Sequence, residues 1–244
     1  VAYEVKVLRE AKVNSNWGNP DENYEKACER FIRKILEPES TFVQQFRPFL
    51  ENVLVEANRY ALTQVAIKIT APGIPDIYQG CELWDLSFVD PDNRRPVDYR
   101  TRQELLTQIG EIEKEGVDQL FTFLHDNRAS GIQKLYTTWK LLSFRNAHPE
   151  IFARGEYLPL PCEGDGQATV AFARRLGNDW VAVIVPLQSQ PAGGSARNRE
   201  ILFPEQGPSR WVDLFTKRTY QHSGKLTVAN LCRDFPLALL FGST

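Results

Sequence analysis

Methionine is absent from this sequence of 244 residues, and cysteine is scarce. The four cysteines (Cys28, Cys81, Cys162 and Cys232) lie far apart with no CxxC pair, which argues against a zinc site and against a compact disulfide framework. Reduced thiols in a cytoplasmic protein are therefore expected. Because the sequence begins at Val1 rather than at a methionine, we expect it to be part of a longer polypeptide.

Net charge and long apolar runs are lacking too. Lysine and arginine number 29 against 31 aspartate and glutamate residues, which gives a formal net charge of -2. No overall basic field exists to attract nucleic acid or anionic lipid. No apolar run reaches the roughly 18–20 residues that span a bilayer, and no basic start followed by an apolar segment marks export. Nucleic-acid and membrane partners are therefore not expected, and a neutral or small polar ligand is favoured.

Helical periodicity dominates the first part of the chain. Apolar residues at the 3.6-residue spacing predict helices over 19–36, 41–69, 102–113 and 131–147. Asn19 is expected to cap the first helix, with Pro20 at its first position, because proline lacks an N–H that would have no partner there. Pro48 is expected to start or kink the second helix, and Pro149 to end the last one.

From about Glu156 the periodicity changes to two, or to short apolar runs. Turns separate the segments EYLPL, ATVAFARR, DWVAVIVP, REILFP, RWVDLF, KLTVANL and PLALLF. Gly177-Asn178 predicts a hairpin turn and Gln188–Ser195 a flexible loop. This close spacing predicts an antiparallel sandwich or barrel. We therefore expect two domains, with helices and one internal strand in 1–155 and a β-rich module in 156–244.

The internal strand lies in an unusual segment, TAPGIPDIYQGCELWDLSFVDPDNRRPVDYR, from Thr70 to Arg100. Ile74–Tyr78 is predicted to be a short buried strand, and a single strand between helices cannot bury its two faces alone. It is therefore expected to join a parallel sheet whose other strands lie elsewhere. In parallel α/β folds, functional groups lie on the loops that follow the carboxyl ends of strands, where the polar residues after Tyr78 would fall.

This segment resembles the eighth barrel strand and following loop of the α-amylase clan, in which Pro-Gly-x-Pro-x-Ile-Tyr-x-Gly-x-Glu precedes an Arg-x-Pro element. ELWD with VDPDNRRPVDY is similar to one family of that clan, the maltooligosyl trehalose synthases. LREAKVNSNW, LSFRNAHPEIFARGEYLPL and DFPLALL match it as well, so the resemblance covers nearly the whole chain. It implies an α+β multidomain fold: a helical segment with the last β/α unit of a TIM-type (β/α)8 barrel, followed by an antiparallel β-sandwich.

The resemblance implies a glucan glucosylmutase that acts on maltooligosaccharides, converts the reducing-end α-1,4 bond into an α,α-1,1 bond, and needs no cofactor or metal. Such a retaining exchange uses two carboxyl groups about 5–5.5 Å apart. No G-x-R-x-D or H-D-T-K-R stretch, which would supply the nucleophile and the third acid, occurs here. The chain thus resembles the C-terminal third of the enzyme, its partner being the upstream part of the same polypeptide. No residue is assigned a catalytic role, and Asp76, Glu82 and Asp85 are interpreted as structural or capping carboxylates.

The resemblance implies that the loop forms an acceptor-side wall of the cleft, with substrate-binding candidates Glu82, Trp84, Asp92, Arg94 and Arg95. The planar guanidinium groups suit sugar hydroxyls or a neighbouring carboxylate. Alternatively, Asp90, Asp92 and Asp98 pair with the arginines and only rigidify the loop. Trp84 and Tyr78 either contact a pyranose face or fill the mouth of the barrel.

Lys12, Asn14, Asn16 and Trp17 either approach the cleft or form a helix-to-helix connection. Two other functions stay open at this point. The chain would be a non-catalytic glucan-binding or interaction module if the β-rich part is the working part. It would belong to a hydrolase of the same clan if the loop sequence does not select the mutase reaction.

Overall fold

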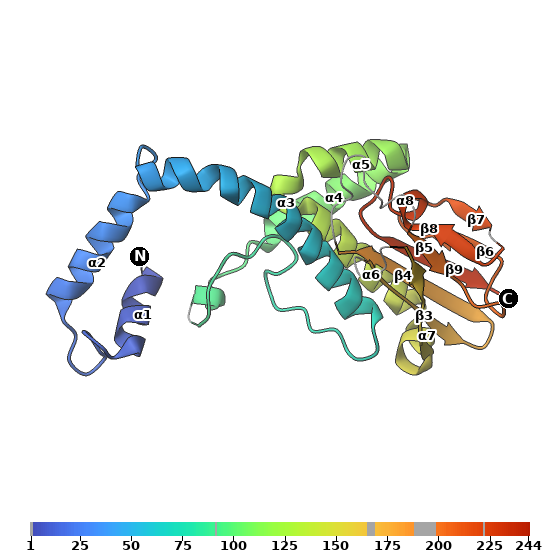
Figure 1. Ribbon diagram of the computed structural model, residues 1–244, viewed down its shortest axis with the longest axis horizontal. Coiled ribbons are helices and arrows are strands. Elements are labelled where there is room, and N and C mark those ends of the chain that lie inside the picture. Colours follow the sequence, from blue (N-terminus) through green and yellow to red (C-terminus); the bar gives the residue numbers. More distant parts are fainter. Residues whose placement is uncertain (1, 91, 165–168, 188–198, 222) are drawn as a thin grey trace. The chain divides into compact units, whose positions relative to one another are not determined.

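The computed structural model describes residues 2–90, 92–164, 169–187, 199–221 and 223–244. They divide into two compact units. Figure 1 labels the helices and strands in chain order. The smaller unit comprises Val1–Val55 and Leu86–Pro96, and the larger unit comprises Glu56–Asp85 and Val97–Thr244. The predicted loop over 188–195 lies outside the described residues. The predicted boundary between 155 and 156 lies within the larger unit, at the change from helices to strands.

Helices make up most of the smaller unit. They are α1 (Ala2–Ala11), α2 (Glu22–Ile35), the first half of α3 (Thr41–Thr70) and the short 3-10 helix η1 (Asp92–Arg94). The helix predicted over 19–36 is confirmed, but its cap is Asp21 instead of Asn19. The Asp21 carboxylate accepts a hydrogen bond from the Tyr24 N–H at 3.0 Å, whereas the Asn19 N–H donates to Asn16 in the preceding turn.

The helix predicted over 41–69 is confirmed as the 30-residue α3, which runs through Pro48 without ending there. Its two halves have different surroundings. Toward its C-terminal end, in the larger unit, Leu62, Val65 and Ile69 are buried. In the smaller unit, Phe42 and Phe49 on the predicted apolar face are exposed instead. The apolar periodicity thus predicts the helix correctly, but only the second half of its apolar face is covered.

The predicted strand over Ile74–Tyr78 is wrong for this structure. These residues form no strand or other regular structure, and Ile74 is 96% exposed instead of buried. A β-strand needs a neighbouring strand to pair its backbone groups. Within the described residues, the first strand occurs only at Glu156, and all recorded pairing partners lie between Glu156 and Ser243.

After this segment the larger unit continues with helices, and the predictions over 102–113 and 131–147 are confirmed. The elements are α4 (Tyr99–Glu115), α5 (Val117–Asp126), the 3-10 helix η2 (Arg128–Ser130), α6 (Ile132–Ala147) and α7 (Pro149–Arg154). Pro149 does follow the end of α6, but it also occupies the first position of α7, a favourable place for proline. Helix α5 had no counterpart in the sequence-based prediction.

Strands follow from residue 156, all recorded pairs are antiparallel, and the predicted antiparallel β-rich module is confirmed. The strands are β1 (Glu156–Pro159), β2 (Cys162–Glu163), β3 (Thr169–Leu176), β4 (Asp179–Pro186), β5 (Glu200–Leu202), β6 (Arg210–Asp213), β7 (Thr219–Gln221), β8 (Lys225–Thr227) and β9 (Ala238–Ser243), with α8 (Val228–Leu231) after β8. One sheet has the order β1-β3-β4-β9-β6-β7, and a second has the order β2-β5-β8. The predicted hairpin is present, since Leu176 pairs with Asp179 and Gly177 has a φ of 60°.

The larger sheet has a core on each face. On one face, Val181, Val183 and Val185 of β4 pack in a cluster with buried residues of α3, α4, α5 and α6. On the other face, Trp180 and Ile184 pack with residues of β5 and α8. The period of two along β4 therefore separates the helical layer from the smaller sheet. None of the helices in the described residues is long and apolar enough to cross a membrane.

Candidate functional site

The loop over 79–85 is held by Arg102, a residue of α4 that the sequence had not indicated. Its guanidinium donates to Glu82 Oε2 at 2.9 Å and to the Gly80 carbonyl at 2.7 Å, and a third bond reaches the Asp98 carbonyl at 2.9 Å. Both charged side chains are largely covered, with exposed fractions of 14% for Arg102 and 23% for Glu82. The Glu82 carboxylate is therefore fixed by a partner from the helix that follows the loop.

Trp84 lies half-buried on the same loop. Its indole N–H donates a hydrogen bond to the Arg128 carbonyl at 3.2 Å. Tyr78, the other aromatic candidate, is 43% exposed. The Cys81 thiol donates to Asp85 at 3.9 Å, and burial raises the pKa of that thiol. The aromatic surface of this loop is thus partly accessible, as a residue in contact with a sugar ring requires.

The arginine-rich part of the segment belongs to the smaller unit. Arg94 pairs with Asp90 at 2.6 Å, and Arg95 pairs with Asp92. Asp92 also accepts a hydrogen bond from the Phe88 N–H at 2.8 Å, which closes the turn around η1. The hydrogen bond from Arg94 holds the pKa of Asp90 below its ordinary value. The expectation that aspartates pair with these arginines is confirmed for both arginines.

Asp98 does not pair with either arginine, and this part of the expectation is wrong. Its carboxylate instead accepts hydrogen bonds from the Thr101 N–H at 3.0 Å and the Thr101 hydroxyl at 2.7 Å. It is therefore the N-cap of α4, a position that favours aspartate because the first N–H groups of a helix have no partner within it. These hydrogen bonds lower the pKa of Asp98.

The paired arginines keep much of their surface accessible. The side chains of Arg94 and Arg95 are 68% and 73% exposed, whereas that of Asp92 is 13% exposed. A guanidinium has five N–H donors, and these exposed fractions leave part of each group in contact with solvent. The turn can therefore be rigid and still offer donors to a ligand, so both interpretations made from the sequence are compatible with this geometry.

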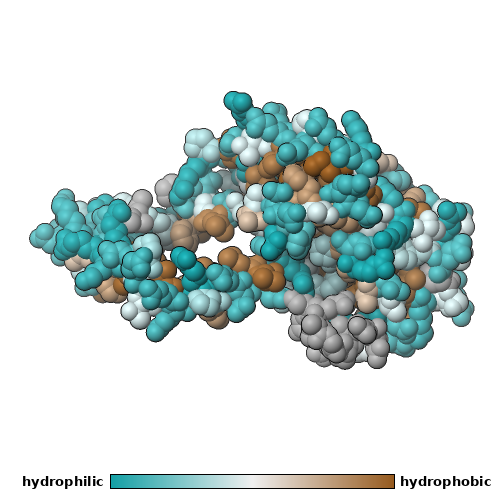
Figure 2. All heavy atoms as spheres, turned by 90° about the horizontal axis from the view of Figure 1, so that it is seen from above, coloured by the Kyte–Doolittle hydropathy of each residue, from teal (hydrophilic) through white to brown (hydrophobic). Residues whose placement is uncertain are grey.

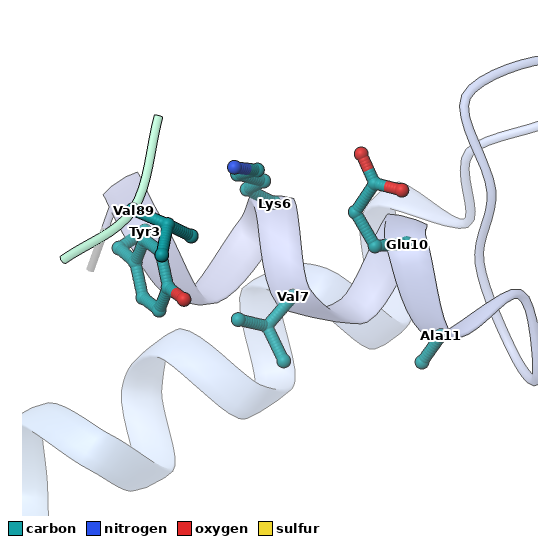
Figure 3. Close-up of a pocket in the computed structure, with 6 residues that line it drawn as sticks. All are labelled: Tyr3, Lys6, Val7, Glu10, Ala11 and Val89. Atoms are coloured by element: carbon teal, nitrogen blue, oxygen red, sulfur yellow. The ribbon is translucent and has the colours of Figure 1, made fainter. Parts of the chain in front are cut away.

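A hollow of about 480 Å³ lies beside α1 and Val89. Figure 3 shows five residues of α1 and Val89 around it, with Lys6 and Glu10 extending to the same side of the helix. Tyr3 stacks on Phe88, with 4.2 Å between the ring centroids. Glu10 is the only acid among the residues that line this hollow, so it offers no pair of carboxyl groups for glycosyl transfer.

Lys12, Asn14, Asn16 and Trp17 lie in the connection between α1 and α2. Lys12 has a φ of 56°, and the Asn16 side chain accepts hydrogen bonds from the N–H groups of Gly18 and Asn19. The Trp17 indole N–H donates to Glu10 at 3.1 Å. Three of the four residues thus have conformations or contacts typical of a helix-to-helix connection.

Potential metal ligands are not clustered in the described part of the chain. No group of three or more histidine, cysteine, aspartate or glutamate side chains there is arranged to hold an ion. All four cysteines lie in the described part of the chain, and none of them forms a disulfide.

Comparison with known proteins places these features in a family context. No protein-family model matches the chain. Proteins named maltooligosyl trehalose synthase from two strains of Mycobacterium tuberculosis are 30% identical to it over 238 residues. This match covers 98% of the chain and 27% of each relative. The chain therefore spans little more than a quarter of the length of these curated relatives.

Solved structures agree with the sequence match. Maltooligosyltrehalose synthase from Arthrobacter ramosus superposes with a TM-score of 0.77 at 28% identity, over 98% of this chain and 29% of that one. The maltooligosyl trehalose synthase of Sulfolobus tokodaii gives a TM-score of 0.68 at 27% identity, over 99% and 28% of the two chains. The chain corresponds to a C-terminal portion of maltooligosyl trehalose synthase. The resemblance of its motifs to maltooligosyl trehalose synthases is thereby confirmed.

Proposed function

We propose that the chain is the C-terminal portion of a (1→4)-α-D-glucan 1-α-D-glucosylmutase. The intact enzyme converts the reducing-end α-1,4 bond of a maltooligosaccharide into the α,α-1,1 bond of a terminal trehalose unit, in the cytoplasm. The similarity to maltooligosyl trehalose synthases over 98% of the chain carries this proposal. The acids that perform the exchange are supplied by the rest of the polypeptide, which is the partner of this chain.

Ile74–Tyr78 becomes the last strand of a (β/α)8 barrel when the rest of the polypeptide is present, and α4 follows it as the last barrel helix. The exposure of Ile74 supports this assignment, because an apolar side chain that is left uncovered here would be buried in a parallel sheet covered on both faces. Residues 156–244 form the C-terminal β-sandwich domain, and residues 1–155 contain the helical region and the end of the barrel.

The rest of the polypeptide also covers apolar residues of the smaller unit. Among the described residues of the smaller unit, the buried side chains are those of Ser15 and Glu25, and no hydrophobic side chain is buried. Large apolar side chains are exposed on it instead: Val7, Val13, Trp17, Phe31, Leu36, Phe42, Phe46, Phe49, Leu50, Val53, Leu54, Val55, Leu86, Phe88 and Val89. Figure 2 shows hydrophobic residues in brown, and several of them are visible on the face that it presents. So much uncovered apolar surface is typical of an interface.

The loop residues contact the glucan and exclude water while the released glucose turns over. Arg94 and Arg95, whose side chains are 68% and 73% exposed, donate to sugar hydroxyls, and Asp92 keeps the turn closed. Glu82 is held by Arg102, and Trp84 presents part of its ring to a pyranose face. Exclusion of water favours transfer to glucose over hydrolysis.

This function predicts a shift in products when both arginines are changed to alanine in the longer polypeptide. With maltohexaose as substrate, we expect the ratio of trehalosyl product to free glucose to fall at least about tenfold, because the loss of a single charged donor, worth about 1.5–3 kcal/mol, already has an effect of that size. Chromatography of the products measures the ratio. Arg100→Ala is the matched control, since Arg100 is 88% exposed and pairs with Glu104 one turn along α4.

An unchanged ratio in the double variant would remove the arginines from the proposed function. Production of glucose without any trehalosyl sugar by the unmodified longer polypeptide would favour a hydrolase instead. The 244-residue chain alone is expected to form neither product. If it binds maltohexaose with micromolar affinity in calorimetry while the longer polypeptide is inactive, a glucan-binding module is the better assignment.

A further inference from the structure

Trp84 is seated on the N-terminal end of α6, and a glycine makes room for it. Gly131 is buried and has a φ of 84°, a left-handed conformation that favours glycine. A Cβ at this position would lie 2.7 Å from the Trp84 backbone nitrogen and 3.1 Å from its Cδ1 atom. Any larger residue would therefore displace Trp84 or the start of α6.

Lys134, one turn into α6, holds the same part of the loop by a second contact. Its ammonium donates a hydrogen bond to the Leu83 carbonyl at 3.2 Å and lies 5.6 Å from the centroid of the Trp84 ring. One charged group thus fixes both the backbone before the tryptophan and the orientation of its ring. The indole N–H, which donates to the Arg128 carbonyl just before α6, fixes the far edge of the ring.

We propose that Gly131 and Lys134 are positioning residues for glucan binding, which act by holding the indole of Trp84 in one orientation before the sugar arrives. This proposal rests on the proposed function, in which Trp84 contacts a pyranose ring. A platform that is already ordered loses little conformational freedom on binding, so its affinity for the ligand is higher. Lys134, Gly131 and Arg128 lie outside the quoted loop sequence, yet together they determine the orientation of its aromatic residue.

The burial of Lys134 agrees with such a role. Its ammonium has given up part of its hydration, which lowers its pKa, and a buried cation is tolerated only where other contacts replace the lost water. The Leu83 carbonyl and the indole ring supply these contacts, and Asp85 and Glu82 are favourable charges in the same neighbourhood.

The contacts that hold Trp84 against Gly131 and Lys134 are tested in the 244-residue chain without any ligand. The chain has five tryptophans, so 5-fluorotryptophan gives a fluorine spectrum in which Trp84→Phe assigns the Trp84 signal. We expect Lys134→Met to shift and broaden this signal, and Lys134→Arg, which keeps a cation and a donor, to restore it. Lys140→Met is the matched control, because Lys140 lies 5.0 Å from the Trp139 ring on the same helix. It should move the Trp139 signal and leave that of Trp84 in place.

The consequence for binding is tested in the longer polypeptide with maltohexaose. Lys134→Met is expected to raise KM about two- to fivefold, the range of a cation–π contact at a partly exposed site, with kcat unchanged. Lys134→Arg should restore KM, and Lys140→Met should leave it unaltered. Gly131→Ala provides a second variant with the same expected direction, and circular dichroism checks that each variant is folded.

If the Trp84 signal does not move in Lys134→Met, Lys134 does not hold the Trp84 indole, and the proposal is wrong. The Trp84 signal could also move in Lys134→Met while KM stays unchanged, in a polypeptide that does make trehalosyl products. This result would show that Lys134 orients Trp84 for structural reasons only and has no role in glucan binding. If the unmodified polypeptide forms no trehalosyl product, the proposed function fails. The fluorine spectra would still decide whether Lys134 orients Trp84, because they are recorded without a ligand.

Discussion

At the residue scale, Glu25 on α2 is a buried carboxylate among the described residues of the smaller unit. Arg9 of α1 donates to both of its oxygens at 2.8 Å, and the Ser15 hydroxyl donates to one of them at 2.5 Å. The Ser15 hydroxyl in turn accepts a hydrogen bond from the Asp21 N–H. This polar cluster therefore links α1, the connection and the cap of α2 in a unit whose described residues include no buried apolar side chain.

The cluster predicts a specific response to acid. The hydrogen bonds from Arg9 and Ser15 lower the pKa of Glu25 from its ordinary value of 4.5 to about 2. Because the pKa in the folded state lies below that in the unfolded state, the stabilisation is complete above pH 4.5 and is lost as the pH falls toward 2. Carbon NMR of the Glu25 carboxyl should show the low midpoint. A midpoint near 4.5 would contradict it, and Glu25→Gln should abolish this part of the acid response.

At the element scale, sequence periodicity located the long helices because their apolar faces repeat over several turns. It missed α5 (Val117–Asp126), and it placed a strand at Ile74–Tyr78, since strand formation depends on pairing partners that the apolar pattern does not reveal. The arginine–aspartate pairs were predictable because they lie three or four residues apart. Arg102 and Lys134 were not, because they contact the loop 20 and 51 residues away in sequence.

The end of α3 also depends on contacts that are distant in sequence. The last carbonyls of a helix have no partner within it. Arg145 of α6 donates to the carbonyls of Ile69 and Gly73 at 2.6 Å, and Arg174 of β3 donates to that of Thr70 at 3.3 Å. The two arginines therefore fix the point at which α3 ends and the loop toward Trp84 begins.

Removal of Arg174 is expected to be costly. Its side chain is buried, and it also donates to the carbonyls of Phe152 and Gly155, so Arg174→Met leaves three carbonyls without this donor. We expect a loss of about 2–4 kcal/mol in the free energy of unfolding by urea. The matched control is Arg175→Met, which removes an arginine that lies over the Trp180 ring and should cost under about 1 kcal/mol. Equal losses would mean that packing, and not the carbonyl contacts, accounts for the effect.

At the scale of the whole molecule, the two units differ in how they are stabilised. The larger unit has a core on each face of its main sheet, built around β4 and the helices. In the smaller unit, the described side chains that are buried are the polar Ser15 and Glu25. Burial of apolar surface is the dominant stabilising term in folding. The smaller unit therefore depends on hydrogen bonds, ion pairs and helix propensity, which contribute much less in net terms.

This difference predicts uneven protection from hydrogen exchange in the isolated chain. Amides of α2 should exchange at least about a hundredfold faster than those of α6 and β4, because local opening exposes little apolar surface in the smaller unit and much in the larger one. Mass spectrometry of the exchanged peptides measures the ratio, and the same peptides in the longer polypeptide provide the control. There, coverage of Phe42, Phe46 and Phe49 should slow exchange in α2 and in the first half of α3. Equal protection of α2 and α6 in the isolated chain would mean that the smaller unit does not need an apolar partner surface.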